Sequence, residues 1–535
     1  MGGWRNFCEK IDLNGIKDTA IINGLKKEAE NNFDEYHVYP DSIQTCCNAV
    51  FFIAKENGTK SLIIYGIGED DCCRNISGKE VTLKDGNAKV CALDVANSKI
   101  IRSIFDYTNP VSHKGQPVTV GLGDRLGLAS PGHIRLIKDK NVFPVLAQQS
   151  IRELNLTNRT YDDVLASAVW AVFQEGYKKG FGADGDHLKT ASEVQMAIDC
   201  GFTMITLDCS DHIKNEITDL SDDHVEKLYL DLPADKREKL EAKYLNRKFK
   251  LENISGDHSA ETAEIPGGNC NTECIEFEKR EFEKIVLTYT DAIDYTINIC
   301  NDVISGCGRI VDFEMSIDET LTSTSPESHF FVGSELLDAG LDVCSLAPRF
   351  CGEFQKGIDY RGDVDKFTRE FDIHCKIAKT LGYKISVHSG SDKFMVFPIV
   401  GEKTEGSYHI KTAGTNWLEA VRVIALKNPA LYRKIHQFAL SVLDEAKKYY
   451  HISADPKTIP DIDSMGDAKL AGFMDIDDSR QILHITYGII LTEKDKTGAP
   501  VFKNDIYKCL NENEDSYYKA LYHHIGRHLK LLGAY

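Results

Sequence analysis

The sequence lacks any apolar run approaching the ~20 residues that cross a bilayer, so no membrane-spanning role is expected. Residues 1–15 contain no basic segment followed by an apolar run and a cleavage site, so no secretory signal is expected. The sixteen cysteines therefore favour reduced thiols in the cytoplasm over a disulfide framework. Basic residues are also scarce: 63 Lys and Arg against 82 Asp and Glu give a net charge of -19, which argues against nucleic-acid binding.

The chain is long enough for one large core and an accessory module, with 535 residues of which 42% are hydrophobic and 27% charged. Its first part predicts β-hairpins. Residues 48–54 and 61–65 flank an Asn57-Gly58 turn, and residues 80–83 and 89–95 flank an Asp85-Gly86 turn. We therefore expect a small β-rich accessory domain over residues 1–110.

After residue 110, short Val- and Ile-rich runs alternate with amphipathic segments such as 161–178 and 364–381, a pattern typical of βα units around a parallel sheet. The candidate strands are 117–122, 142–147, 180–186, 203–207, 309–313, 341–345, 384–387 and 408–410. Eight strands predict a (β/α)8 TIM-like barrel, an α/β fold, over residues 111–430.

Two further segments do not fit simple βα repeats. The stretch after the fourth strand is too long for one connection and includes a charged, helix-like region at 222–250, so residues 213–282 are predicted to be an insertion. Residues 431–535 show helical patterns at 430–449 and 517–532 and are predicted to form a C-terminal helical extension.

Histidines, acids and lysines follow several of the predicted strands. The motifs are GADGDHLK (182–189), TLD (206–208), FE (313–314), VHSGSDK (387–393) and HIKT (409–412). Strand ends of a parallel barrel meet at one mouth, so these side chains are expected to converge there. Each motif alone is also compatible with a surface turn or a hydrogen-bonded core histidine, but together they suit a divalent ion such as Zn, Mn, Fe, Co or Ni.

The segment GLGDRLG (121–127) resembles a dinucleotide-binding loop but has one residue too many before its third glycine. It also lacks a clear acidic partner for a ribose, so no NAD is expected. Arg125 and Arg349 have the planar fork that recognises carboxylates, although a structural turn and a surface salt bridge are equally compatible with them.

These strand-end motifs, together with GLGDR (121–125), resemble the tagaturonate epimerase family of bacterial hexuronate catabolism. The likeness extends over residues 117–415, most of the predicted barrel. It implies the interconversion of D-tagaturonate and D-fructuronate, which are keto acids derived from hexuronates, assisted by a divalent metal.

The implied reaction inverts a carbinol carbon that is β to the ketone, so its C–H is not acidic enough for simple enolisation. Retro-aldol cleavage would instead leave a metal-stabilised enediolate and an aldehyde that rotates before rejoining. Two acid/base groups would move the hydroxyl proton. Transient oxidation would need a hydride acceptor, for which the sequence has no nucleotide fingerprint.

The resemblance yields a set of candidate residues. The expected metal ligands are His187, Asp208, His388 and His409, and the expected acid/base groups are Glu314 and Asp186. The expected substrate contacts are Lys189, Lys411, Arg125, Arg349 and Ser389. A metal-dependent aldolase or ketose isomerase acting on a related sugar acid, or a non-catalytic sugar-acid-binding protein, remains an alternative.

Overall fold

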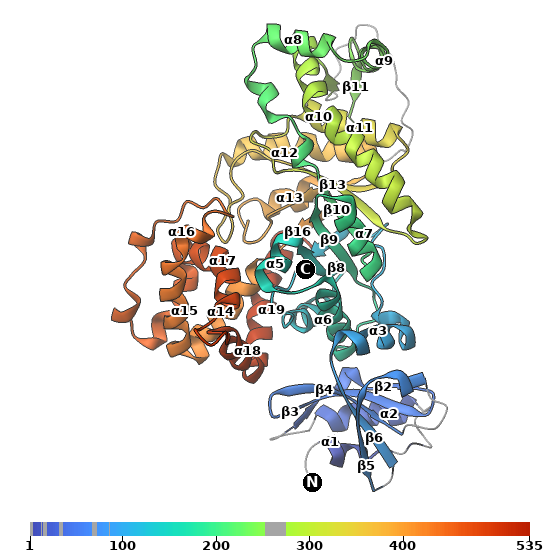
Figure 1. Cartoon of the computed structure of the whole chain (residues 1–535), viewed down its shortest axis with the longest axis vertical. Helices are drawn as coiled ribbons and strands as arrows, with labels where there is room; N and C mark the ends of the chain where they lie inside the picture. Colours follow the sequence, from blue (N-terminus) through green and yellow to red (C-terminus); the bar gives the residue numbers. More distant parts are fainter. Residues whose placement is uncertain are drawn as a thin grey trace.

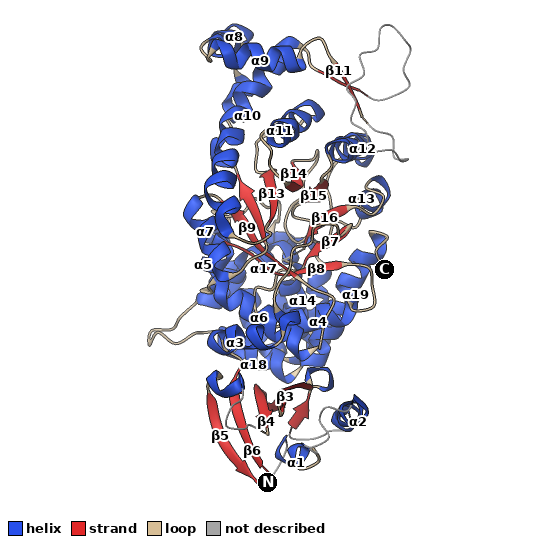
Figure 2. Ribbon diagram, turned by 90° about the vertical axis from the view of Figure 1, so that its right-hand side faces the viewer, coloured by secondary structure: helices blue, strands red, loops and turns tan. Residues whose placement is uncertain are grey.

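The computed structural model describes residues 4–11, 13, 19–30, 36–66, 72–84, 86–251, 274–412 and 414–535. At its centre, parallel strands close into a barrel, and helices surround them (Figure 2). In order around the barrel the strands are β10 (Met204–Asp208), β13 (Asp312–Ile317), β14 (Val343–Pro348), β15 (Lys384–Val387), β16 (Tyr408–Lys411), β7 (Val118–Gly121), β8 (Phe143–Ser150) and β9 (Gly182–Leu188). These are the eight predicted strands, so the predicted barrel is confirmed.

The strands are buried on both faces, as in β8, where every residue is buried. The covering helices are α4 (Ser130–Ile137), α5 (Ile151–Thr157), α6 (Tyr161–Gln174), α7 (Ala191–Cys200), α10 (Lys279–Ile299), α11 (Pro326–Asp338), α12 (Val364–Leu381) and α13 (Phe397–Lys403). Thr160 begins α6 with a capping box. This helix ends before residue 178, the predicted limit, because Gly176 adopts a φ of 56° and turns the chain.

An antiparallel sheet precedes the barrel and lies at the bottom of Figure 1. It contains β1 (Tyr36–Val38), β2 (Gln44–Cys46), β3 (Ala49–Glu56), β4 (Thr59–Tyr65), β5 (Gly78–Leu83) and β6 (Gly86–Ala92), with α1 (Trp4–Cys8) and α2 (Thr19–Glu30) beside it and α3 (Val95–Ile104) after it. The hairpin at Asn57-Gly58 is confirmed, whereas Asp85 of the second turn lies outside the described residues. Tyr39 donates a hydrogen bond to Glu514 at 2.9 Å and thereby joins the sheet to the C-terminal helices.

The insertion after the fourth strand lies at the other end of the molecule (Figure 1). It contains α8 (Asp222–Leu230), α9 (Ala234–Tyr244), β11 (Lys248–Lys250) and β12 (Cys274–Glu276), and residues 252–273 of it lie outside the described ranges. Rings from the insertion, α10 and α11 pack together: Tyr244, Phe249, Phe277, Phe282, Phe330 and Phe331. This aromatic cluster attaches the insertion to the barrel.

The C-terminal helices form a second core beside the barrel (Figure 1). They are α14 (Thr415–Lys427), α15 (Pro429–Ser441), α16 (Leu443–Ala446), α17 (Asp477–Thr492), α18 (Lys503–Glu512) and α19 (Glu514–Leu531). Helix α17 packs on α5, and α19 packs on α4. Within the described ranges, no helix has both the length and the apolar composition needed to cross a membrane.

The aromatic cluster gives a first prediction. Phe282 is 0% exposed, so Phe282→Ala should lower the free energy of unfolding by about 3–5 kcal/mol through lost contacts and a cavity. Leu230, which is 54% exposed in the same insertion, provides the control, and Leu230→Ala should change stability by less than about 0.5 kcal/mol. Urea denaturation followed by circular dichroism measures both, and equal midpoints for the two variants would contradict the packing described.

Candidate functional site

A single ammonium group lies among the acidic residues inside the barrel. Nζ of Lys411 donates hydrogen bonds to Oδ1 of Asp186 and Oγ1 of Thr206, both at 2.6 Å. It also lies 3.0 Å from Oε1 of Glu314 and 3.1 Å from Oδ2 of Asp184. Alternate residues of a strand face the same side, which is why Asp184 and Asp186 of β9 both point inward. Three buried carboxylates therefore share one countercharge.

Two histidines at strand ends approach one further carboxylate. Nδ1 of His388 lies 3.2 Å from Oδ1 of Asp318, and Nε2 of His187 lies 3.8 Å from the same oxygen. The potential ligand atoms of the three residues all lie within 4.8 Å of one another. Nδ1 of His388 is buried and has no hydrogen-bond partner within the described ranges. The three residues could therefore hold a metal ion between them.

The second nitrogen of each histidine faces a carboxylate. Nδ1 of His187 donates to Asp186 at 2.8 Å, and Nε2 of His388 donates to Glu314 at 2.7 Å. Metal-binding histidines usually have such a partner, because it fixes the ring and increases its basicity. Burial alone would lower the pKa of His187, but Asp186 and Asp318 raise it well above its ordinary value. The donor set fits a divalent metal ion.

Charge pairing decides which groups are ionised at the centre of the barrel. Burial alone would lower the pKa of Lys411, but the three carboxylates around it hold that pKa well above its ordinary value. Burial would raise the pKa of Glu314, yet Lys411 and His388 hold it well below its ordinary value. Burial raises the pKa of Asp184 to about 6 against the opposing effect of Lys411. Lys411 and Glu314 are therefore charged at neutral pH.

Unusual backbone conformations set the direction of the strand-end residues. His187 has a φ of 52° and Ser389 a φ of 50°, which are uncommon values for residues other than glycine. Gly390 lies so close to β16 that an added Cβ would be 2.5 Å from Cγ1 of Ile410. The close approach holds the loop that carries His388 against the next strand.

These residues face a cavity between the barrel and α17. Its barrel side is lined by Asp186, His187, Asp318, His388 and Lys411. Arg125, Lys356 and His484 also line it. The cavity thus gives a small ligand access to the histidine pair.

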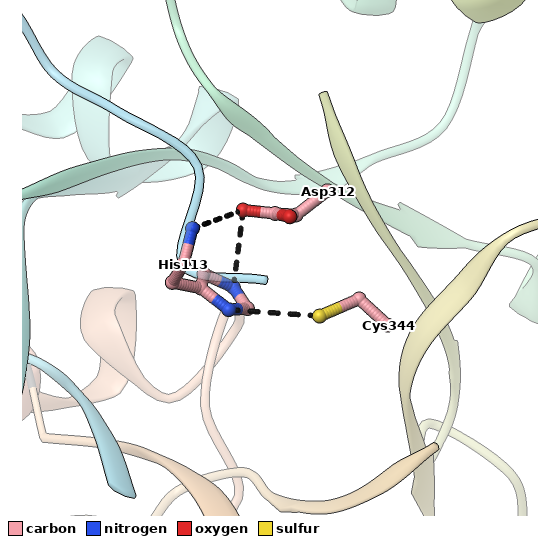
Figure 3. Close-up of side chains that lie close together, drawn as sticks. All are labelled: His113, Asp312 and Cys344. Atoms are coloured by element: carbon pink, nitrogen blue, oxygen red, sulfur yellow. Dashed lines mark hydrogen bonds and ion pairs between the residues drawn. The ribbon is translucent and has the colours of Figure 1, made fainter. Parts of the chain in front are cut away.

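A second group of potential ligands lies at the other end of the barrel strands, where His113, Asp312 and Cys344 face one another (Figure 3). Nδ1 of His113 lies 3.3 Å from Nζ of Lys384, a group that can only donate when protonated. Burial, and then Lys384, lower the pKa of His113 to about 4, so its ring is neutral. Asp312 already accepts hydrogen bonds from Oγ of Ser112 and the backbone N–H of His113. Nζ of Lys384 thus lies beside Nδ1 of His113, the position that a cation bound to this nitrogen would take.

A third group connects the loop after β15 with α19. Nε2 of His528 accepts a hydrogen bond from the backbone N–H of Asp392 at 3.0 Å, and its Nδ1 donates to the carbonyl of His524. Both ring nitrogens are thus already engaged. Arg480 of α17 donates to Asp392 at 2.7 Å. This group holds the loop that carries His388 and has no nitrogen of His528 left for a metal.

Comparison with known proteins identifies the family. Residues 39–265 and 267–532 match the profile of the tagaturonate epimerase family. The chain belongs to this family. The resemblance seen in the strand-end motifs is thereby confirmed.

Members of the tagaturonate epimerase family align with almost the entire chain. The tagaturonate/fructuronate epimerase of Thermotoga maritima is 38% identical over 499 residues, which cover 93% of this chain and 97% of that protein. The native crystal structure of fructuronate-tagaturonate epimerase UxaE from Cohnella laeviribosi has a TM-score of 0.87 at 44% identity and covers 97% of this chain and 100% of that one. A structure of the same protein with two glycerols has a TM-score of 0.87 at 45% identity and covers 94% and 97%.

In this member of the tagaturonate epimerase family, most of the predicted site residues lie close together. His187 and His388 lie side by side, with ring centroids 4.8 Å apart. Asp186, Glu314 and Lys411 adjoin them. Arg125 and Ser389 line the same cavity.

Four predicted residues lie elsewhere. Asp208 accepts from the backbone N–H of Ser210 at 2.9 Å, and Lys189 donates to Asp211 at 2.8 Å. His409 lies deeper in the barrel, where its ring stacks on that of His113 at 5.9 Å. Arg349 lies outside the cavity lining, and its backbone pairs with Thr324.

Asp318, Lys356 and His484 line the cavity but were not predicted as part of the site. Asp318 follows β13, and the alternation of Asp312, Glu314 and Ser316 continues to it. Extending that alternation past the end of the strand would have found it. Lys356 and His484 have no such signal, because a loop and a distant helix bring them to the cavity.

The shared countercharge gives a second prediction. Lys411→Met should lower the free energy of unfolding by about 3–5 kcal/mol near pH 8, because it leaves buried carboxylates unpaired. Without Lys411, burial would raise the folded-state pKa values of these carboxylates above their unfolded-state values. The destabilisation is then largest at high pH and shrinks as the pH falls through the raised values. Urea denaturation near pH 8 and at a pH below the raised pKa values measures the effect.

Lys214 offers a matched control, since its side chain is 44% exposed and that of its ion-pair partner Asp291 is 51% exposed. Lys214→Met should cost less than about 1 kcal/mol at either pH. A Lys411→Met penalty that does not change with pH would show that the carboxylates do not depend on this charge.

Proposed function

We propose that this chain interconverts D-tagaturonate and D-fructuronate with the help of a divalent metal ion. The relatives that align with nearly its full length are named for this reaction. The observation that supports the proposal most directly is the convergence of His187, Asp318 and His388 at the cavity. The substrate is a small sugar acid that enters this cavity.

His187, Asp318 and His388 would hold the metal, which we expect to be Zn, Mn, Fe, Co or Ni from the imidazole and carboxylate donors. When bound, such an ion acts as a Lewis acid that stabilises negative charge on a substrate oxygen. Asp186 and Glu314 orient the two imidazoles and keep them basic.

The inverted carbon is β to the ketone, so abstraction of its hydrogen gives no stabilised carbanion. Cleavage of the adjacent carbon–carbon bond instead yields an enediolate and an aldehyde. Rotation of the aldehyde before the bond re-forms inverts the carbinol centre. A closed cavity that retains both fragments is therefore a requirement of this route.

Asp186 is the proposed acceptor of the hydroxyl proton. It lines the cavity, and its Oδ1 lies 2.6 Å from Nζ of Lys411, so its carboxylate would accept the proton during cleavage and return it during rejoining, while the charged Lys411 donates a hydrogen bond to it. Glu314 is 0% exposed and contacts both Lys411 and His388. Its proposed part is to keep Lys411 charged and His388 oriented.

A third prediction concerns the proposed ligands. Loss of a residue that hydrogen-bonds to a metal ligand weakens metal binding by about 10- to 100-fold. Because His388 is itself a proposed ligand, His388→Ala should weaken divalent-metal binding by at least as much, and activity should fall with it. Metal analysis after dialysis measures binding, and thermal melting checks the fold. His409→Ala is the comparison, since His409 stacks on His113 away from the three ligands. Metal lost from His409→Ala but retained in His388→Ala would overturn the proposed ligand set.

A fourth prediction tests the reaction itself. Purified protein given D-tagaturonate and a divalent salt should form D-fructuronate, and a chelator should stop it. In deuterium oxide the inverted carbon should keep its original hydrogen, because the proposed route breaks a carbon–carbon bond there. Chromatography and mass spectrometry measure both results. Deuterium at the inverted carbon would exclude the route, and net release of three-carbon products would indicate an aldolase instead.

A further inference from the structure

One wall of the cavity carries polar atoms that have no partner among the described residues. These atoms are Nη1 of Arg125 and both ring nitrogens of His484. Arg125 is only 5% exposed and His484 only 1%, yet both line the cavity that contains the histidine pair. A buried polar group left unpaired costs about 1–3 kcal/mol, so a ligand that pairs with these atoms gains binding energy.

Arg125 is held rigidly with one nitrogen left over. Its Nε and Nη2 both lie 2.8 Å from Oε1 of Glu153. Its guanidinium lies 3.8 Å from the ring centroid of Tyr487 in α17. Glu153 thus fixes one edge of the planar guanidinium and Tyr487 fixes one face of it. Nη1 is the donor that remains for a ligand.

His484 is positioned by two glycines that pass close to its ring. A Cβ added at Gly414 would be 2.1 Å from Cε1 of His484, and one at Gly357 would be 3.2 Å from its Nδ1. No larger residue fits at Gly414 without moving the ring. The histidine is therefore packed against backbone, and its nitrogens have no hydrogen-bond partner in the described part of the chain.

Lys356 connects this wall to the histidine pair. Its Nζ donates to Oγ of Ser389 at 2.7 Å, and Ser389 directly follows His388. The acids on the same wall are already engaged, because Glu153 pairs with Arg125 and Glu319 lies 3.6 Å from Arg152. The lining of the cavity therefore includes basic side chains, at Arg125 and Lys356, as well as the acids Asp186 and Asp318.

We infer that Arg125, Lys356 and His484 bind the carboxylate group of the sugar acid and select it over neutral sugars. The inference rests on the proposed function and deepens it. A keto acid has its carboxylate at one end and its ketone near the other, so its carboxylate can pair with these three residues while its ketone lies at the histidine pair. A neutral ketohexose carries a hydroxymethyl group in place of the carboxylate and would leave the three residues without that partner.

The test compares His484→Asn and Lys356→Met with the wild type. Loss of one hydrogen bond to a charged group should raise the KM for D-tagaturonate by about 10- to 100-fold. The inhibition constant of neutral D-tagatose should stay unchanged in the same variants. His436→Asn is the matched control, because His436 is 1% exposed in the same helical region and lies outside the cavity lining. Its KM should equal that of the wild type.

Direct binding separates this inference from the proposed function. Calorimetry with D-galactonate, a six-carbon sugar acid without a ketone, should show weaker binding to both variants even if the wild type converts no substrate. The inference is overturned if the wild type is active and both variants keep its KM. It is also overturned if both variants bind the sugar acid and the neutral sugar more weakly by the same factor. Tighter binding of a ketohexose 6-phosphate than of the sugar acid to the wild type would overturn it as well.

Discussion

Four charged side chains at the centre of the barrel can be buried only because they are buried together. Lys411 lies within hydrogen-bonding or ion-pair distance of Asp184, Asp186 and Glu314, and each of these would be costly to bury alone. The four come from β9, β13 and β16, which are not all neighbours in the barrel. Their meeting therefore requires the sheet to close, and the same carboxylates then orient His187 and His388.

The C-terminal helices contribute to the site as well as to the second core. Arg480 of α17 and His524 of α19 hold Asp392, and with it the loop that begins at His388. Helix α17 also brings His484 to the cavity and packs Tyr487 against Arg125. A barrel without these helices would lack one wall of the cavity and the support of the loop after β15.

Three clusters contain histidines and acids in similar numbers, yet their hydrogen bonds distinguish them. Nζ of Lys384 lies beside Nδ1 of His113, and both ring nitrogens of His528 already form hydrogen bonds. At the cavity, Nδ1 of His187 and Nε2 of His388 each donate to a carboxylate, and Nδ1 of His388 has no hydrogen-bond partner among the residues that the structure describes. The partner of the second nitrogen, more than the proximity of the ligands, supports the proposed metal site.

Local patterns in the sequence determined the barrel, because runs of buried residues at βα spacing identify parallel strands, and residues at their ends must share one mouth. That reasoning also found His187, His388, Asp186, Glu314 and Lys411. It did not place Asp318, which lies beyond the end of β13, or show that His409 stacks on His113 deeper in the barrel. Depth along a strand and the packing of a distant helix depend on barrel closure and side-chain direction. Only the tertiary structure therefore decided which nitrogens of the histidines face a carboxylate and that His484 reaches the cavity.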